Sequence, residues 1–182
     1  MTAAEVPLPV STPRVAVSAS PSDLARALMA DAAEAGTPHP DTYRVLDAVP
    51  ELMRTFHDHW RAVFDHGVVE RPLKELVRRK IANYHECVTC KSVAVDSDRD
   101  RMDVKLQASY AWRDAPELDD RERAAMWLVD HLMGNDDAVD DVYAELHRHF
   151  ADAEIVELGW FAAFNVGTIP FVRSWNLHGT KP

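Results

Sequence analysis

The spacing of apolar residues is the feature that most constrains the fold of this chain. Apolar side chains recur at steps of three and four, and no segment of useful length alternates apolar and polar residues as a strand does. Leu, Ala, Val, Arg and Glu are abundant and glycine occurs only six times, which favours helix. The sequence therefore predicts an all-α protein. Two segments show the helical spacing most clearly: Leu52, Met53, Phe56, Trp60, Val63 and Phe64, then Leu73, Leu76, Val77, Ile81 and Tyr84.

Helix-start and helix-stop residues divide this pattern into elements. Ser22 or Asp23 can cap a first short helix that Gly36 ends. A second begins in "TPHPDTYRVLDAVP", and a third runs from Pro50 to about Gly67. A fourth begins near Pro72. The segment "MDVKLQASYAW" predicts one or two further helical turns.

The C-terminal half gives equally local signals. Asp119, followed three residues later by Glu122, resembles a capping box that opens a helix through Leu132. The loop "MGNDDAVDD" leads into a helix that ends near residue 150. Asp152 is expected to cap a long final helix, which Pro170 should kink or end.

The length of 182 residues suits one domain with one sizeable core. Residues 1–20 contain Pro7, Pro9 and Pro13 and few charges, and we expect an extended N-terminal arm that packs on a partner subunit. Residues 21–182 are predicted to form a single helical domain.

Charge and hydropathy exclude several kinds of partner. The formal net charge of −10 argues against nucleic acid and against an anionic membrane, because binding to phosphate needs clustered Lys and Arg. The chain contains no run of 18 or more apolar residues, so we expect no membrane span. The N-terminus lacks a basic start followed by an uninterrupted apolar segment, so we expect a cytoplasmic protein.

Both cysteines of the chain lie in "ANYHECVTCKSVAV", as Cys87 and Cys90. A helix break is expected near His85 and Glu86, with a new helix starting at the cysteines. The terminus of a helix lowers the pKa of a nearby thiol, and His85 and Lys91 are further groups that can stabilise a thiolate. Residues three apart on a helix have Cβ atoms about 5–6 Å apart, so a slightly tightened first turn lets the pair form a disulfide.

Two other interpretations of the pair remain open. The cysteines can be small core residues on one face of a helix. They can also be half of a metal site, with ligands from His57, His59 and His66. A structural metal site needs four ligands and the chain has no second CxxC, and histidines in "FHDHW" are more typical of a surface or an interface between subunits. We therefore predict no metal and no cofactor.

The segment "KELVRRKIANYHECVTCKSVAV" resembles the signature of the carboxymuconolactone decarboxylase superfamily, in particular its AhpD-like alkylhydroperoxidase branch. That signature is a Glu twelve residues before a CxxC, with a His four residues after the second Cys. Here Glu75 occupies the first position, and Ala94 replaces the His. The resemblance covers roughly residues 40–175, through "LDDRERAAMWLVDHL" and "FADAEIVELGWFAAFN", and more weakly through "VLDAVPELMRTFHDHWRAVFDHG".

The resemblance implies an AhpD-like helical bundle in which Cys90 attacks a peroxide and Cys87 resolves it. The position at a helix start by itself favours Cys87 as the nucleophile, so the two arguments disagree, and we follow the resemblance. Glu75 is the candidate base, with a surface pair to Arg79 as its structural alternative. His85 is a candidate to replace the missing imidazole.

The resulting functional hypothesis is a thiol-dependent oxidoreductase that reduces organic hydroperoxides or exchanges disulfides with a redox partner protein. Without a His at position 94 we expect slow peroxide turnover but competent exchange. The alternative is a carboxymuconolactone decarboxylase-like enzyme that acts on a small metabolite without redox cycling, and a third is a non-catalytic or redox-sensing protein. The resemblance also implies a homo-oligomer, a trimer or a hexamer.

Overall fold

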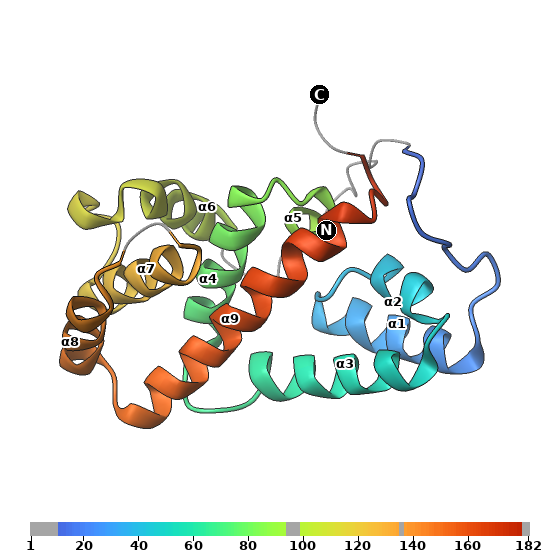
Figure 1. Cartoon of the computed structure of the whole chain (residues 1–182), viewed down its shortest axis with the longest axis horizontal. Helices are drawn as coiled ribbons and strands as arrows, with labels where there is room; N and C mark the ends of the chain where they lie inside the picture. Colours follow the sequence, from blue (N-terminus) through green and yellow to red (C-terminus); the bar gives the residue numbers. More distant parts are fainter. Residues whose placement is uncertain (1–10, 94–98, 135–136, 180–182) are drawn as a thin grey trace.

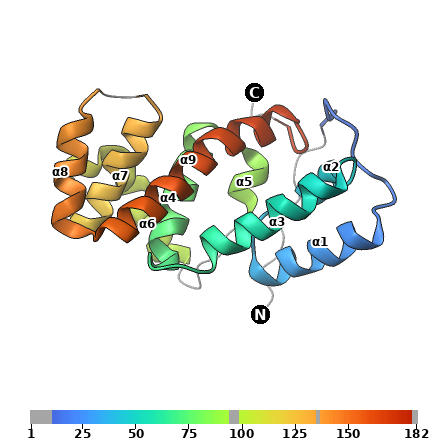
Figure 2. The same ribbon diagram turned by 60° about the horizontal axis from the view of Figure 1, so that its bottom comes forward.

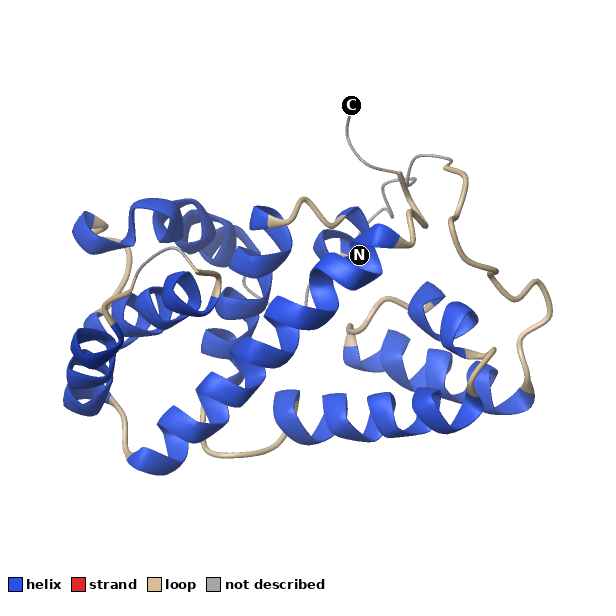
Figure 3. Cartoon of the chain, viewed as in Figure 1, coloured by secondary structure: helices blue, strands red, loops and turns tan. Residues whose placement is uncertain are grey.

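The computed structural model describes residues 11–93, 99–134 and 137–179, and within these residues it contains helices and loops but no strand (Figures 1 and 3). This confirms the all-α prediction. The helices are α1 (Asp23–Ala35), α2 (Asp41–Leu46), α3 (Pro50–Phe64), α4 (Arg71–Tyr84), α5 (Val88–Ser92), α6 (Arg99–Ala108), the 3₁₀ helix η1 (Ser109–Asp114), α7 (Asp120–Leu132), α8 (Val139–His149) and α9 (Asp152–Ser174).

The capping signals place two helices as predicted. The Ser22 hydroxyl accepts a hydrogen bond from the backbone N–H of Ala25, and Gly36 follows α1 with a φ of 80°. The Asp119 carboxylate accepts from the backbone N–H of Glu122, whose side chain accepts in return from the N–H of Asp119. Both caps satisfy N–H groups that a helix leaves without an internal partner.

The last helix departs from its prediction at both ends. Asp152 is its first helical residue, not its cap, and Glu154 accepts a hydrogen bond from the N–H of Ala151 at 2.8 Å. Pro170 lies inside α9, which continues to Ser174, so it does not end the helix, and the other half of the expectation, a kink, stays a prediction. A proline removes one backbone hydrogen bond, and here the buried Ile169 packs into the core and favours helical geometry at this point.

Helices α4 to α9 form what we call the large lobe, and α9 crosses the molecule beside α4 (Figures 1 and 2). Its core is one continuous cluster of buried apolar side chains, to which the inner face of α3 also contributes. The fully buried members include Leu76, Ile81, Met126, Leu158 and Phe161. The CxxC segment is therefore attached to the best-packed part of the molecule.

Helices α1 to α3 and their connections form the small lobe, at the other side of α9 (Figure 2). It has a separate cluster in which only Ala25, Ala32, Tyr43 and Met53 are buried, with partly buried neighbours around them. Leu52, expected in the core from its spacing, is 52% exposed. The described residues thus form two apolar clusters of unequal size.

The described part of the N-terminal arm, residues 11–20, contains no helix and lies against its own chain. The N–H of Arg14 donates to the carbonyl of Trp175, and the N–H of Ser18 donates to the carbonyl of Arg44. Residues 1–10 lie outside the described part. The arm therefore connects the C-terminal segment to α2 within one protomer.

Helix α9 is long and apolar enough to cross a membrane by length and composition. In the structure, however, Leu158, Phe161, Ala162 and Ile169 of this helix are buried in the large-lobe core. Among the described residues this is the one helix that meets the test, and a third of its most apolar window is buried inside the protein.

Candidate functional site

Cys87 and Cys90 lie at the start of α5, and their sulfurs are at disulfide distance with Cα atoms 5.3 Å apart. Cys87 is the N-cap, and its Sγ accepts a hydrogen bond from the N–H of Cys90 at 3.2 Å. Helix α4 ends just before, at His85, and Glu86 has a φ of 50° that turns the chain into the cysteines. The predicted helix break and new helix start are confirmed.

The two sulfurs have different surroundings. Cys87 is 0% exposed and belongs to the large-lobe core. Cys90 is half-buried and lies on the wall of a cavity of about 40 Å³. A small reactant in that cavity therefore meets Cys90, and it reaches Cys87 only through Cys90.

The cavity lies where the two lobes meet. Thr37, His39 and Trp60 line it from the small lobe, while Arg78 and Asn165 line it from the large lobe. Three buried polar atoms on this wall, Thr37 Oγ1, Trp60 Nε1 and Asn165 Oδ1, have no hydrogen-bond partner among the described residues. Buried polar groups are nearly always paired with protein or water, so this wall suits a small polar group or ordered water.

Glu75 is 1% exposed and forms a bidentate ion pair with Arg78, three residues later on α4. Arg78 Nε and Nη2 donate to the two carboxylate oxygens, each at 2.8 Å. The surface pair of Glu75 with Arg79 is therefore wrong, since Arg79 instead pairs with Asp103 at 2.6 Å. The pairing follows from burial, because a buried carboxylate needs a close, hydrogen-bonded cation.

Arg78 also holds α5 in place. Its Nη1 donates to the carbonyl of Cys90 at 2.7 Å and its Nη2 to the carbonyl of Val93 at 2.9 Å. Glu75 is not among the residues that line the cavity. Its visible role is to orient Arg78, which positions the backbone of the CxxC helix.

His85 is the C-cap of α4, precedes the cysteine pair in the sequence and does not line the cavity. Burial, with a smaller contribution from the Arg173 guanidinium, lowers the pKa of His85 below its usual value. Its Nε2 is buried without a hydrogen-bond partner in the described residues. Tyr84, expected in the core, is about half exposed, because it sits at the end of α4 where the chain turns away.

Ala94, the position that departs from the AhpD-like signature, lies outside the described residues. Sequence reasoning missed Arg78, His39 and Asn165, which surround Cys90 in the cavity. Only Arg78 left a usable signal, since a cation three residues after Glu75 lies on the same helical face.

The histidines considered as metal ligands do not meet the cysteines. His57 is 8% exposed, so its expected surface position is wrong, and its Nδ1 lies 2.8 Å from the Tyr43 hydroxyl. The ring of His59 packs on Phe164 with centroids 4.5 Å apart. His57 is thus paired within the small lobe, whereas His59 packs against α9 of the large lobe.

An apolar groove of about 430 Å³ lies beside the cavity, between α3 and α9. The groove and the cavity share Thr42, Phe56, Thr168 and Val172 as walls. The rest of the groove is mainly aromatic and aliphatic, with Leu46, Leu52, Trp160, Phe164, Phe171 and Trp175. An elongated apolar molecule can thus lie against the same wall that bounds the space next to Cys90.

Comparison with protein-family models, with curated proteins and with solved structures finds no match for this chain. The resemblance to AhpD-like proteins therefore rests on the sequence signature alone.

Proposed function

We propose that the protein is a thiol-dependent oxidoreductase of the AhpD-like kind, which cycles Cys87 and Cys90 between dithiol and disulfide. The observation that supports this most directly is the unequal burial of the pair: Cys90 lines a cavity and Cys87 lies behind it in the core. This is the arrangement that an attacking and a resolving thiol need. It favours Cys90 as the nucleophile, as the resemblance implies.

The proposed reduction of a hydroperoxide has two steps. The Cys90 thiolate attacks the terminal peroxide oxygen, the O–O bond breaks, and the alkoxide leaves as an alcohol after taking a proton. Cys90 is then a sulfenic acid. The Cys87 thiol attacks its sulfur, water leaves, and the disulfide forms. A dithiol partner protein supplies two electrons and two protons to restore the thiols.

The geometry favours thiol–disulfide exchange over fast peroxide chemistry. Glu75 is engaged on both oxygens by Arg78, and His85 does not line the cavity. Ala94 stands where the signature has its His. We therefore expect slow peroxide turnover with competent disulfide exchange.

The shape of the site indicates the substrate class. The cavity of about 40 Å³ has room for a reacting group but not for a large molecule. The adjoining groove is almost entirely apolar, so an organic hydroperoxide with an apolar body fits the two spaces together.

The test combines thiol alkylation with peroxide consumption. The reduced protein, C87S and C90S are alkylated across a pH series, and consumption of an organic hydroperoxide is followed alongside. We expect a reversible intramolecular disulfide in the wild type, and a sulfenic acid that accumulates in C87S but not in C90S. E75Q is assayed in the same way, with R79Q as its matched control, because Arg79 lies on the same helix and pairs with Asp103 instead.

Two outcomes would reject the proposal. If both thiols titrate above their ordinary pKa of about 8.5 and no disulfide forms on oxidation, the redox role fails. A decarboxylase-like activity on a small metabolite would then be the better hypothesis. If the disulfide forms but neither peroxide nor a disulfide substrate is turned over, a redox sensor is the better hypothesis.

We also propose that the protein forms a homo-oligomer, a trimer or a hexamer, in the cytoplasm. On α9, Val156, Trp160 and Phe171 are all more than 60% exposed, and Trp160 and Phe171 also line the rim of the apolar groove. Aromatic residues are enriched at interfaces between subunits, and monomers seldom expose many of them on one helix. Neither nucleic acid nor a membrane is a proposed partner, given the net charge of −10.

Light scattering at micromolar concentration tests the assembly. The wild type should have the mass of an oligomer, and the W160E variant should have a mass closer to that of a monomer. Y143E changes an exposed aromatic residue on α8 and serves as the control. A monomeric wild type would reject the assembly proposal without affecting the redox proposal.

A further inference from the structure

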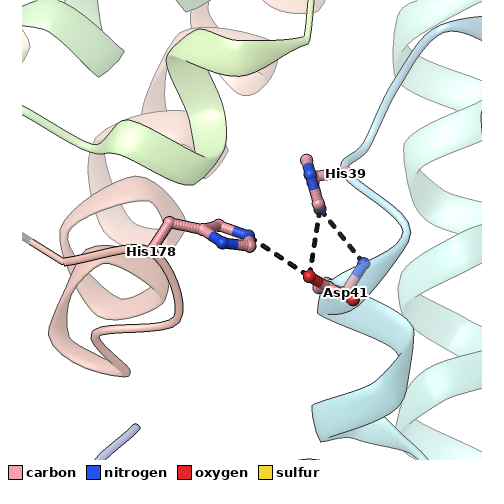
Figure 4. A group of neighbouring side chains, drawn as sticks. All are labelled: His39, Asp41 and His178. Carbon is pink, nitrogen blue, oxygen red and sulfur yellow. Dashed lines mark hydrogen bonds and ion pairs between the residues drawn. The ribbon is translucent and has the colours of Figure 1, made fainter. Parts of the chain in front are cut away.

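Three potential metal ligands from distant parts of the chain meet beside the cysteine cavity. They are His39, Asp41 at the start of α2, and His178 in the segment after α9 (Figure 4). His178 Nε2 lies 3.3 Å from Asp41 Oδ2, and His39 Nδ1 lies 4.0 Å from the same oxygen. The candidate ligand atoms all lie within 4.8 Å of one another.

The surrounding contacts hold these side chains in place. Arg44 Nη1 donates to Asp41 Oδ1 at 3.1 Å, which leaves Oδ2 facing the two imidazole rings (Figure 4). His178 follows Asn176, whose carbonyl accepts from the Ser11 hydroxyl and whose side-chain amide donates to the carbonyl of Thr12. The Arg44 bond orients the Asp41 carboxylate in the way that second contacts orient metal ligands, whereas the Asn176 contacts fix the backbone of the segment that carries His178.

The donor set selects a class of ion. Two imidazole nitrogens and one carboxylate oxygen suit zinc and other first-row divalent transition metals, whereas Ca²⁺ and Mg²⁺ prefer oxygen alone. Tetrahedral zinc with ligands at about 2.0–2.1 Å places the ligand atoms about 3.3 Å apart. The 3.3 Å pair already meets this spacing. His39 Nδ1 accepts a hydrogen bond from the backbone N–H of Asp41 at 3.1 Å, so His39 reaches the ion either by giving up this bond or through its Nε2. The partly exposed His39 and Asp41 side chains rotate to close the remaining distance.

We propose that His39, Asp41 and His178 bind one divalent transition-metal ion, with zinc as the best fit and water in the remaining position. The ion links the C-terminal segment to the start of α2. His39 and Cys90 line the same cavity, so the ion would lie next to the part of the cavity wall that the small lobe forms. The metal site is independent of the proposed redox chemistry, because neither cysteine is one of its ligands.

Thiolates bind zinc strongly, so the test uses the oxidised protein and a C87S/C90S variant. Zn²⁺ alone is titrated by calorimetry, and Co²⁺ by its visible absorption, which reports the geometry of the ligands. We expect one ion per chain in both proteins. H178A, H39A and D41N should each weaken binding at least tenfold. H147A is the matched control, because His147 is exposed and pairs with Asp152 on the far helices.

Folding of each variant is checked by far-UV circular dichroism, and H178Q is a second, milder change at the same position. Amide exchange of residues 175–179 should slow when Zn²⁺ binds the wild type, and this change should be absent in H178Q. Failure of the oxidised wild type to bind one ion, or equal binding by H178A and wild type, would overturn the proposal. Neither result would bear on the disulfide chemistry, which is measured without added metal.

Discussion

The two lobes use different means to fix their part of the cavity. The helices of the large lobe pack around a continuous apolar core, and the ion pair of Glu75 and Arg78 is buried between them. The small lobe has a minor cluster and relies on caps, a tyrosine–histidine hydrogen bond and contacts with the N-terminal arm. The cysteine side of the cavity is therefore held by a large buried core, whereas the opposing wall depends on a small core and on local hydrogen bonds.

The largest expected effect comes from the buried ion pair of the large lobe. R78M should lower the free energy of unfolding by about 3–5 kcal/mol, because it leaves the Glu75 carboxylate buried without its cation. The double variant E75L/R78M should recover much of that loss, since both charges are then removed. Urea unfolding measures both. Equal stability of R78M and the wild type would show that the pair does not hold the large lobe as described.

A pair of core truncations compares the two clusters directly. L158A, in the large lobe, should cost about 4 kcal/mol, and M53A, in the small lobe, about 2 kcal/mol, both within the range for such truncations of about 2–5 kcal/mol. The small cluster has partly buried neighbours that can close around the gap.

Amide exchange extends this comparison. M53A should speed exchange mainly in α1 to α3, whereas L158A should speed it in α4 and α9 as well, because small clusters open locally. If M53A accelerates exchange equally throughout the chain, the lobes unfold as one unit and the contrast between them is lost.

A pH-dependent contact joins the lobes at the loop between α3 and α4. Glu157 of α9 accepts from the N–H groups of Val68 and Val69 and from Lys74. Burial raises the pKa of Glu157, but these hydrogen bonds and the Lys74 charge outweigh it, so its pKa lies below the usual value. Gly67 has a φ of 100°, and any side chain there would collide with this carboxylate.

The lowered pKa fixes the sign of the pH effect. The ionised Glu157 stabilises the fold fully above its ordinary pKa of about 4.5, and this stability is lost as the pH falls through the folded value. E157Q should lower the free energy of unfolding by about 1–3 kcal/mol at neutral pH and flatten its decline below about pH 4.5. Urea unfolding at several pH values measures this. A parallel decline in both proteins would contradict it.

The smallest expected effects come from the helix caps, one in each lobe. S22A and D119A should each cost about 1 kcal/mol, since each removes a side chain that accepts from an N–H of the first helical turn. The Ser22 hydroxyl also holds the pKa of Asp47 below its usual value through a hydrogen bond, so S22A should raise that pKa. Thermal unfolding and NMR titration measure the two effects. D119A, which should leave Asp47 unchanged, is the control.

The sequence by itself determined the class of the fold and most helix boundaries. Ser22, Gly36 and the pair of Asp119 and Glu122 act on backbone groups within a few residues, so their effect can be deduced locally. The same holds for the turn at Glu86 that starts the helix at the cysteines. Pro170 does not end α9, because its neighbours pack against residues that are far away in the sequence, and this packing keeps the segment helical.

Only the tertiary structure decided which of these residues meet. Nothing near Glu75 in the sequence distinguished Arg78 from Arg79 as its partner, because both lie at helical spacing and burial alone selects between them. The unequal exposure of the two sulfurs depends on the core behind Cys87 and on the small lobe opposite Cys90. His39 and His178 are 139 positions apart in the sequence and come together because the C-terminal segment folds back onto α2, a long-range contact that no local pattern encodes.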